Sequence, residues 1–178
     1  MPTPDRTSLD QIVSAARDIL EAEGLAGLTM QSVASAVGVR APSLYKRVQS
    51  RDDLIRLVAE ATVQELSTRL EPGATVADYA SEFRAFALER PAGFQLVMAP
   101  GAHLPRPGVE YLLAATEPLL RATALLAGEE HALDAARTVT AWATGFIGME
   151  LSGGFNLGGD VEAAWDYGVE RLVAAISA

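Results

Sequence analysis

Four basic side chains stand between residues 40 and 51 of this 178-residue chain, and no acidic residue interrupts them. They are Arg40, Lys46, Arg47 and Arg51. Lysine and arginine bind phosphate groups, and an arginine can also donate two hydrogen bonds to the edge of a guanine base. If the surrounding elements hold these side chains on one exposed face, that face could bind duplex DNA.

The residues around the first of these cations have the pattern of two short helices joined by a tight turn. Thr29 can cap a first helix in which Val33 and Val37 recur at helical spacing. Gly38 can end that helix, because glycine adopts the left-handed backbone that closes a helix. Pro42 suits the first turn of a second helix, where its missing N–H costs nothing. The spacing therefore predicts a helix-turn-helix whose second helix begins near Pro42.

The second helix should have an inner and an outer face. Leu44 and Val48 stand at i and i+4 and should point inward. Ser43, Lys46 and Arg47 are then left on the outer face, where they can contact DNA. Glycine-linked helix pairs also occur in helical proteins that never bind DNA, so this pattern alone leaves a purely structural role open.

The next helix should begin at Ser50. Ser50 can cap it, with Asp53 three positions later in the manner of a capping box, and Asp52 also favours a helix N-terminus. These two acidic residues are therefore interpreted as structural.

The order of these residues resembles the N-terminal domain of the TetR family, the tetracycline-repressor-like transcriptional regulators. The resemblance covers about Ser8 to Leu57. It is carried by Ala15 to Gly24, Leu28-Thr29, Val33-Ala34, Val37-Gly38-Val39, Ser43-Leu44-Tyr45 and Leu54. Many members have Phe where this chain has Val48 and Lys where it has Arg51, and both replacements are expected to keep the chemistry.

The resemblance implies a regulator that places its second helix in the major groove of DNA. It also puts Thr29, Tyr45 and Arg51 where the family contacts phosphates, while Arg47 could read a base. The complete set of expected DNA-contacting residues is Thr29, Gln31, Arg40, Ala41, Pro42, Ser43, Tyr45, Lys46, Arg47 and Arg51.

The net charge of −9 at pH 7 is unusual for a DNA-binding protein, but it is not spread evenly along the chain. Residues 1–56 carry seven of the 14 basic side chains and seven of the 23 acidic ones, so the negative excess lies after Arg56. A neutral head with a local basic patch and an acidic body would discourage indiscriminate binding to DNA.

Composition limits the class of protein. The chain is 49% hydrophobic, which is ample for a core, and it contains no cysteine, which fits a reducing compartment. The longest run without Asp, Glu, Lys or Arg covers 16 residues, 24–39, and is too short and too polar to span a membrane. The N-terminus lacks the apolar segment of a secretory signal. We therefore expect no membrane association and a cytoplasmic protein.

The rest of the chain shows helical spacing without the alternation typical of strands. This predicts an all-α fold with an N-terminal three-helix helix-turn-helix DNA-binding domain, residues 1–56, and a C-terminal helical ligand-binding and dimerisation domain, residues 57–178. A first helix should run from Ser8 to Gly24, and a longer fourth helix should stop at Pro72-Gly73. Later helices are expected over 76–90, 94–98, 109–126 (bent or broken near Pro118), 129–153 and 160–176, with a proline-rich loop over 99–108.

The C-terminal part is rich in large apolar side chains, including Tyr79. The resemblance implies a small-molecule site between such helices, although stripes of this kind form core more often than pocket. Glu150 lies in an apolar run, and a buried carboxylate needs a partner, so it could orient a cationic or hydroxylated ligand. The expected contacts to a small, largely apolar effector are Phe83, Phe86, Phe94, Met98, Trp142, Phe146, Met149 and Glu150.

Small residues repeat along the helix expected over 129–153. Glycine inside a helix costs about 1 kcal/mol relative to alanine, so this repetition indicates a close approach of another helix. The resemblance implies that the last two helices of each subunit form a four-helix dimer interface, and packing within one chain is the alternative. The expected interface residues are Ala141, Gly145, Gly148, Ser152, Trp165, Gly168 and Leu172.

Catalysis is the rival class of function. With no cysteine and only His103 and His131, the sequence offers no metal-ligand cluster, no cysteine–histidine pair and no phosphate-binding glycine loop. We therefore expect no cofactor, no metal and no catalytic residue, although two carboxylates in a helical cavity would leave no sequence motif. A helix-turn-helix protein controlled by a protein partner is a further alternative. The favoured interpretation is a homodimeric repressor that a small molecule releases from a palindromic operator.

Overall fold

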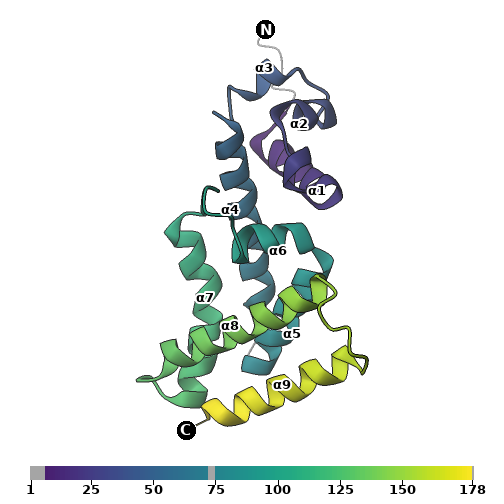
Figure 1. The fold of residues 1–178 in the computed structure, drawn as a ribbon. Helices are drawn as coiled ribbons and strands as arrows, with labels where there is room; N and C mark the ends of the chain where they lie inside the picture. The colour runs from purple at the N-terminus through teal and green to yellow at the C-terminus, as the bar shows by residue number, and fades with distance from the viewer. Residues whose placement is uncertain (1–6, 72–74, 178) are drawn as a thin grey trace. The chain divides into compact units, whose positions relative to one another are not determined.

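The computed structural model describes residues 7–71 and 75–177, and within these ranges every regular element is a helix (Figure 1). The expected all-α fold is therefore confirmed. The helices are α1 (Leu9–Gly27), α2 (Met30–Ala36), α3 (Ala41–Leu44), α4 (Arg51–Leu70), α5 (Val76–Glu89), α6 (Pro91–Met98), α7 (Val109–Ala127), α8 (Ala132–Leu151) and α9 (Val161–Ile176). The expected helix stop at Pro72-Gly73 lies outside the described residues.

The first helix begins as its sequence predicts and is interrupted where a stop was expected. The Ser8 hydroxyl accepts a hydrogen bond from the Gln11 N–H at 3.1 Å, and the Gln11 side chain accepts one from the Ser8 N–H at 2.9 Å. Gly24 has φ +67°, a left-handed backbone that breaks the regular helix. A last helical turn then extends α1 to Gly27.

Three expected boundaries differ from the structure. α7 is continuous from Val109 to Ala127, so Pro118 does not break it. Pro118 and its neighbour Leu119 are both buried, so side-chain packing continues across the position that lacks an N–H. α8 begins at Ala132 instead of 129, because Gly128 takes φ +80° after α7 and the chain then turns. α6 begins at Pro91 instead of 94, since proline suits the first turn of a helix.

The chain folds into two compact units. Unit 1 comprises residues 1–63 and 90–109, and unit 2 comprises residues 64–89 and 110–178. α6 and the proline-rich segment that follows it therefore belong to the same unit as the helix-turn-helix. The boundary expected at residue 56 from sequence stays a prediction.

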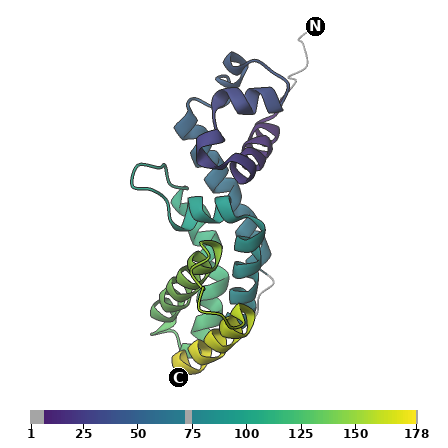
Figure 2. The same ribbon diagram turned by 45° about the vertical axis from the view of Figure 1, so that its right-hand side comes forward.

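Unit 1 is built around α1. This helix packs against α2 and α6, and α2 packs against α3. The segment over 99–108 is a loop, as predicted (Figure 2). It is fixed to unit 1 because Leu104 packs on the core and the Gly108 N–H donates to Glu60 Oε1 at 3.3 Å. The buried side chains of this core are Ile12, Ala16, Leu20, Leu28, Val33, Ala34, Leu44, Val48, Leu54, Ile55, Val58, Ala59 and Leu96.

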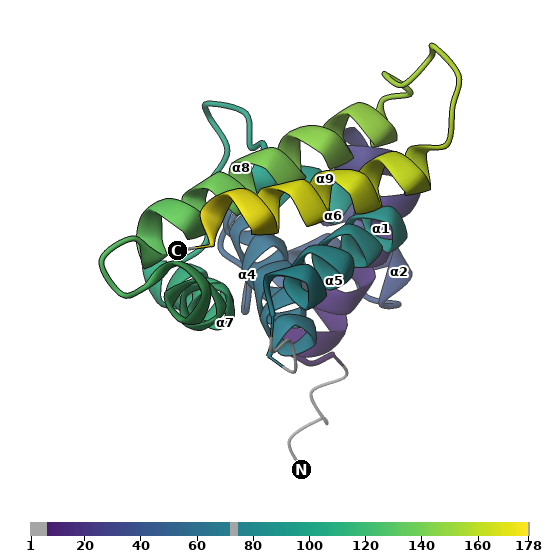
Figure 3. The same cartoon turned by 90° about the horizontal axis from the view of Figure 1, so that it is seen from below.

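Unit 2 is a bundle in which α5 packs against both α8 and α9. α8 and α9 lie side by side and run in opposite directions (Figures 1 and 3). α7 is tied to the start of α8 because the buried Thr123 hydroxyl donates to the Ala132 carbonyl at 2.8 Å. None of the helices in the described part of the chain has the length and apolarity that a membrane crossing needs.

Candidate functional site

α2 is held at both ends by the residues that its sequence predicts. The Thr29 hydroxyl accepts a hydrogen bond from the Ser32 N–H, and the Ser32 hydroxyl accepts one from the Thr29 N–H, both at 3.0 Å. At the other end Gly38 has φ +72°, and the Val39 N–H donates to the Ala34 carbonyl at 2.9 Å. The predicted cap at Thr29 and the predicted turn at Gly38 are therefore confirmed.

α3 is shorter than the predicted second helix. It covers Ala41–Leu44, after which the chain turns and the Arg47 and Val48 N–H groups both donate to the Leu44 carbonyl, at 2.8 and 2.9 Å. Leu44 and Val48 are 1% and 0% exposed, so their predicted inward position is confirmed. Ser50 then caps α4 two residues after the buried Val48.

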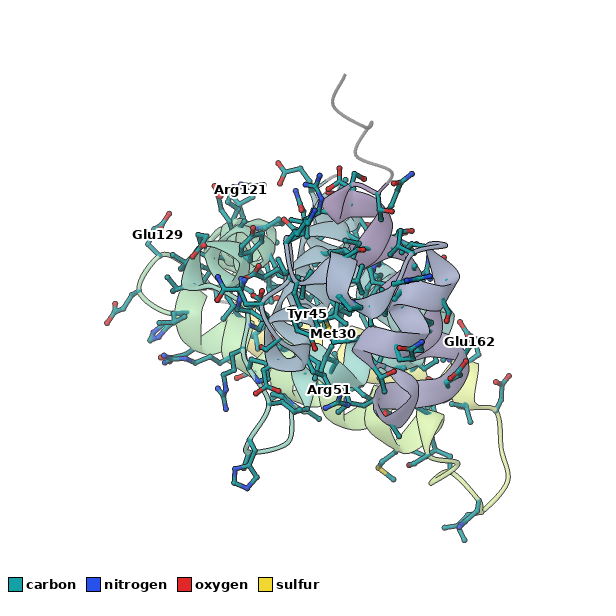
Figure 4. The ribbon with its side chains drawn as sticks, turned by 90° about the horizontal axis from the view of Figure 1, so that it is seen from above. Met30, Tyr45, Arg51, Arg121, Glu129 and Glu162 are labelled. Atoms are coloured by element: carbon teal, nitrogen blue, oxygen red, sulfur yellow. The ribbon has the colours of Figure 1, made fainter. Side chains whose placement is uncertain are left out.

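Most of the predicted DNA-contacting side chains are exposed on the helix-turn-helix. Thr29 and Ala41 are half-buried. Tyr45 is 54% exposed although it is aromatic, and it is labelled with Arg51 in Figure 4. The remaining members of the set are also exposed: Gln31, Arg40, Pro42, Ser43, Lys46, Arg47 and Arg51. The predicted set therefore lies on the helix-turn-helix and the start of α4, and most of its side chains are open to solvent.

Part of the Arg51 guanidinium is engaged within the chain. Its Nε donates to the Leu28 carbonyl at 2.8 Å, and its Nη2 donates to the Leu25 carbonyl at 2.6 Å. Both carbonyls lie at the corner between α1 and α2. The sequence did not indicate this contact, because the partners are 23 and 26 positions away.

Asp53 has the structural role expected of it at the start of α4, and Asp52 also lies in the first turn of that helix. The Ser50 hydroxyl accepts a hydrogen bond from the Asp53 N–H at 3.0 Å. The Asp53 carboxylate accepts one from the Gln49 N–H at 2.8 Å instead of from Ser50, so the expected box closes one residue earlier. This bond and the contact with Arg56 at 2.7 Å lower the pKa of Asp53.

The side chains expected to line an effector site fall into both units. Phe94 and Met98 lie on α6 and belong to unit 1. The other members belong to unit 2, where Phe83 and Phe86 are buried on α5 and Met149 on α8 is 48% exposed. The expected set therefore does not form one group within unit 2.

In unit 2 the aromatic rings of α8 and α9 form one cluster. The Trp142 and Phe146 rings lie 4.9 and 5.1 Å from the Trp165 ring, and the Phe155 ring lies 4.7 Å from the Phe146 ring, between centroids. Trp165 is 2% exposed, so it packs inside its own chain. Phe155 was missed from sequence because it lies in the loop before α9, outside any helical periodicity.

Glu150 has a partner within the chain. Arg84 on α5 donates to both of its carboxylate oxygens, from Nε at 2.9 Å and from Nη2 at 2.7 Å, and donates from Nη1 to Glu162 at 2.7 Å. The Arg84 guanidinium also lies over the Trp165 ring, 5.2 Å from its centroid. The hydrogen bonds with Glu150 and Glu162 raise the pKa of Arg84. Glu150 is half-buried, and this arginine supplies the partner that its carboxylate needs.

The stripe of small residues on α8 is open in the single chain. Ala141, Gly145, Gly148 and Ser152 are all exposed, and a Cβ atom added at Gly145 or Gly148 would meet no atom within 4 Å. Gly168 on α9 differs, since a Cβ there would overlap the Trp142 ring of the same chain. Gly168 is therefore needed for the close packing of α8 against α9.

Two protein-family models match the chain. The model for bacterial regulatory proteins of the tetR family matches residues 12–58, and the model for the tetracyclin repressor-like C-terminal domain matches residues 76–172. An HTH-type transcriptional regulator of Saccharopolyspora erythraea is 30% identical over 199 aligned residues, which cover 95% of this chain and 84% of that protein.

Two further relatives cover different shares of the chain. The tetracycline repressor protein class E of Escherichia coli is 36% identical over 67 residues, 38% of this chain, and the match spans 32% of that protein. A solved structure of a TetR variant from Acinetobacter baumannii AYE in complex with minocycline has a TM-score of 0.69 and 24% identity, over 95% of this chain and 96% of that one. At this identity the likeness shows the fold.

Proposed function

This chain belongs to the TetR family of bacterial transcriptional regulators, and on that premise we propose that it is a homodimeric repressor of a palindromic operator, released by a small, largely apolar effector. The observation that carries the proposal is the exposed face of the helix-turn-helix. Its cations are exposed, and no acidic residue lies between Arg40 and Arg51. The buried Leu44 and Val48 anchor this segment to the core. As a DNA-binding regulator of transcription, it would act in the cytoplasm.

The proposed DNA contacts fall into two kinds. Lys46 and Arg47 lie in the turn after α3, beyond Tyr45, and are exposed, which suits a base contact by Arg47 and a phosphate contact by Lys46. Thr29 and Tyr45 would bind phosphate through their hydroxyl groups. Gln31, Arg40, Ala41, Pro42 and Ser43 complete the surface that would enter the major groove.

The effector is proposed to bind unit 2. Its proposed lining is Phe83, Phe86, Trp142, Phe146 and Met149. The Acinetobacter baumannii TetR variant of similar fold is in complex with minocycline, which supports a small-molecule effector for a body of this architecture. Glu150 would act on the effector only indirectly, since Arg84 occupies both of its carboxylate oxygens. An effector with higher affinity for the released conformation would lower the affinity for the operator.

The first test is binding to DNA fragments that flank the gene of this protein, because repressors of this type often control neighbouring genes. The double variant Lys46→Ala, Arg47→Ala should weaken operator binding by about 1–3 kcal/mol or more in a gel-shift titration. Its binding to non-specific DNA should weaken less. Arg137→Ala is the matched control, since it removes an exposed cation of unit 2. Equal binding by the folded double variant and the wild type would contradict the DNA-binding face.

The second test concerns the effector. A thermal screen with apolar compounds should find at least one that raises the melting temperature and also lowers operator affinity, because linkage requires both effects of a single ligand. Compounds that only stabilise the protein would indicate a closed core and would favour control by a protein partner.

A further inference from the structure

Arg51 connects the start of α4 to the corner between α1 and α2. Its guanidinium donates to the carbonyls of Leu25 and Leu28, at 2.6 and 2.8 Å. Leu28 is 0% exposed and directly precedes Thr29, whose hydroxyl caps α2. We infer that Arg51 is a positioning residue for DNA binding, which holds the N-terminus of α2 in place, and that it does not bind phosphate. This inference depends on the proposed DNA-binding function.

The carbonyls at this corner need donors from elsewhere. The last carbonyls of a helix have no partner within the helix, and cations stabilise this negative end of the helix dipole. The last turn of α1 contains no basic residue of its own. Arg51 supplies donors for Leu25 and Leu28, and the Ser32 hydroxyl donates to the Gly27 carbonyl at 2.7 Å. Side chains of α2 and α4 thus complete the end of α1.

The shape of the arginine side chain matters at this corner. A guanidinium is planar and has five N–H donors in a fixed fork, so one side chain can reach two separate carbonyls. A lysine ammonium is a point charge on a flexible stem and does not reproduce this fork. From the sequence, arginine and lysine were expected to be equivalent at position 51. The two hydrogen bonds of the Arg51 guanidinium to separate carbonyls indicate that they are not.

The two roles of Arg51 differ in their dependence on salt. A phosphate contact releases counterions, so its loss lowers the slope of log affinity against log salt concentration by about one. A positioning residue acts through the backbone at Leu28, so its loss lowers affinity without changing the number of phosphates that the protein neutralises. The charge of the replacement is decisive, because lysine preserves a phosphate contact and does not preserve the fork.

The experiment measures operator affinity at several salt concentrations between about 50 and 200 mM, a range over which such slopes can be measured. The proteins compared are the wild type, Arg51→Ala, Arg51→Lys and the control Lys46→Ala. We expect Arg51→Ala and Arg51→Lys each to lose roughly tenfold in affinity with the wild-type slope. Lys46→Ala should lower the slope. Faster amide hydrogen exchange at Thr29 and Met30 in both Arg51 variants would locate the effect at the N-terminus of α2.

Three other outcomes would overturn the inference, each in a distinct way. Wild-type affinity in Arg51→Lys with a lowered slope in Arg51→Ala would identify a phosphate contact. Unchanged affinity in both folded variants, with only a lower melting temperature, would identify a role in stability alone. If Arg51→Ala does not fold, Arg51→Lys still decides between charge and shape. Absence of specific binding by the wild type would refute the proposed function itself, and the inference with it.

Discussion

At the scale of single residues, Arg84 shows how folding satisfies a cation inside a helical bundle. Its side chain is 9% exposed, and two carboxylates of very different exposure hold it: Glu150 at 18% and Glu162 at 68%. Removal of one partner of a buried ion pair leaves a desolvated charge, whereas an exposed pair contributes little. The two carboxylates should therefore differ strongly in their effect on stability.

Glu150→Gln should lower the free energy of unfolding by about 3 kcal/mol, because the buried guanidinium loses the less exposed of its two charged partners. Glu162→Gln is the matched control and should cost less than about 1 kcal/mol, since water already reaches that carboxylate. Urea denaturation of both variants measures the difference. Equal losses would contradict the argument that the less exposed carboxylate carries most of the pairing energy of Arg84.

Tyr79 should lower the stability of unit 2 at high pH. Burial raises the pKa of Tyr79 from 10.0 to about 12, because the phenolate would lose its hydration. The unfolded chain therefore ionises first, so the contribution is fully present below pH 10 and is lost as the pH rises to about 12. Tyr79→Phe should lack this loss of stability at high pH. The measurement compares urea midpoints of both proteins at about pH 9 and about pH 11.5, below and within the range where Tyr79 ionises. An identical decline in both proteins would contradict it.

Sequence reasoning at this scale succeeds where partners are close in the chain. The cap at Thr29, the turn at Gly38 and the inward Leu44 all depend on residues within five positions, and all are confirmed. Arg84 was missed because its partner Glu150 lies 66 positions away, and no local pattern links them. DNA binding by the exposed set depends on a partner outside the chain, so it stays a prediction.

At the scale of elements, α6 depends on a residue of α1. The side chain of Arg90, at the N-cap of α6, does not cap the helix. Instead, Glu21 of α1 accepts hydrogen bonds from the N–H groups of Ala92 and Gly93, at 3.0 and 2.9 Å. A carboxylate at this position also favours the positive end of the helix dipole. The helical spacing predicted a short helix near residues 94–98, but its packing within unit 1 depends on contacts 71 and 72 positions apart that no periodicity reveals.

Glu21→Ala should destabilise unit 1 by about 1 kcal/mol, the usual effect of losing a helix cap. Amide hydrogen exchange at Ala92 and Gly93 should accelerate, because these N–H groups lose their acceptor. Glu23→Ala provides the control, since Glu23 is an exposed carboxylate of the same helix. If exchange at Ala92 and Gly93 is unchanged, another group caps α6 in solution.

At the scale of the whole molecule, we expect the charge distribution to make operator binding depend on dimer formation. The chain has a net charge of −9, with its negative excess after Arg56, so a single basic face must attract DNA against an acidic body. Two joined subunits would engage two half-sites, and the second contact would then be intramolecular. Operator affinity should therefore report on the dimer interface as well as on the helix-turn-helix.

Gly148→Leu tests the proposed interface, because the single chain leaves this position open. No atom lies within 4 Å of a Cβ added there, so the subunit itself should tolerate leucine within about 0.5 kcal/mol. If a partner helix approaches Gly148 across a twofold axis, the same side chain should separate the dimer and abolish cooperative operator binding. Gly168→Ala is the contrasting variant, since its Cβ would overlap the Trp142 ring and should destabilise the subunit. Sedimentation equilibrium distinguishes the two effects, and a folded, fully dimeric Gly148→Leu protein with wild-type operator binding would place the interface elsewhere.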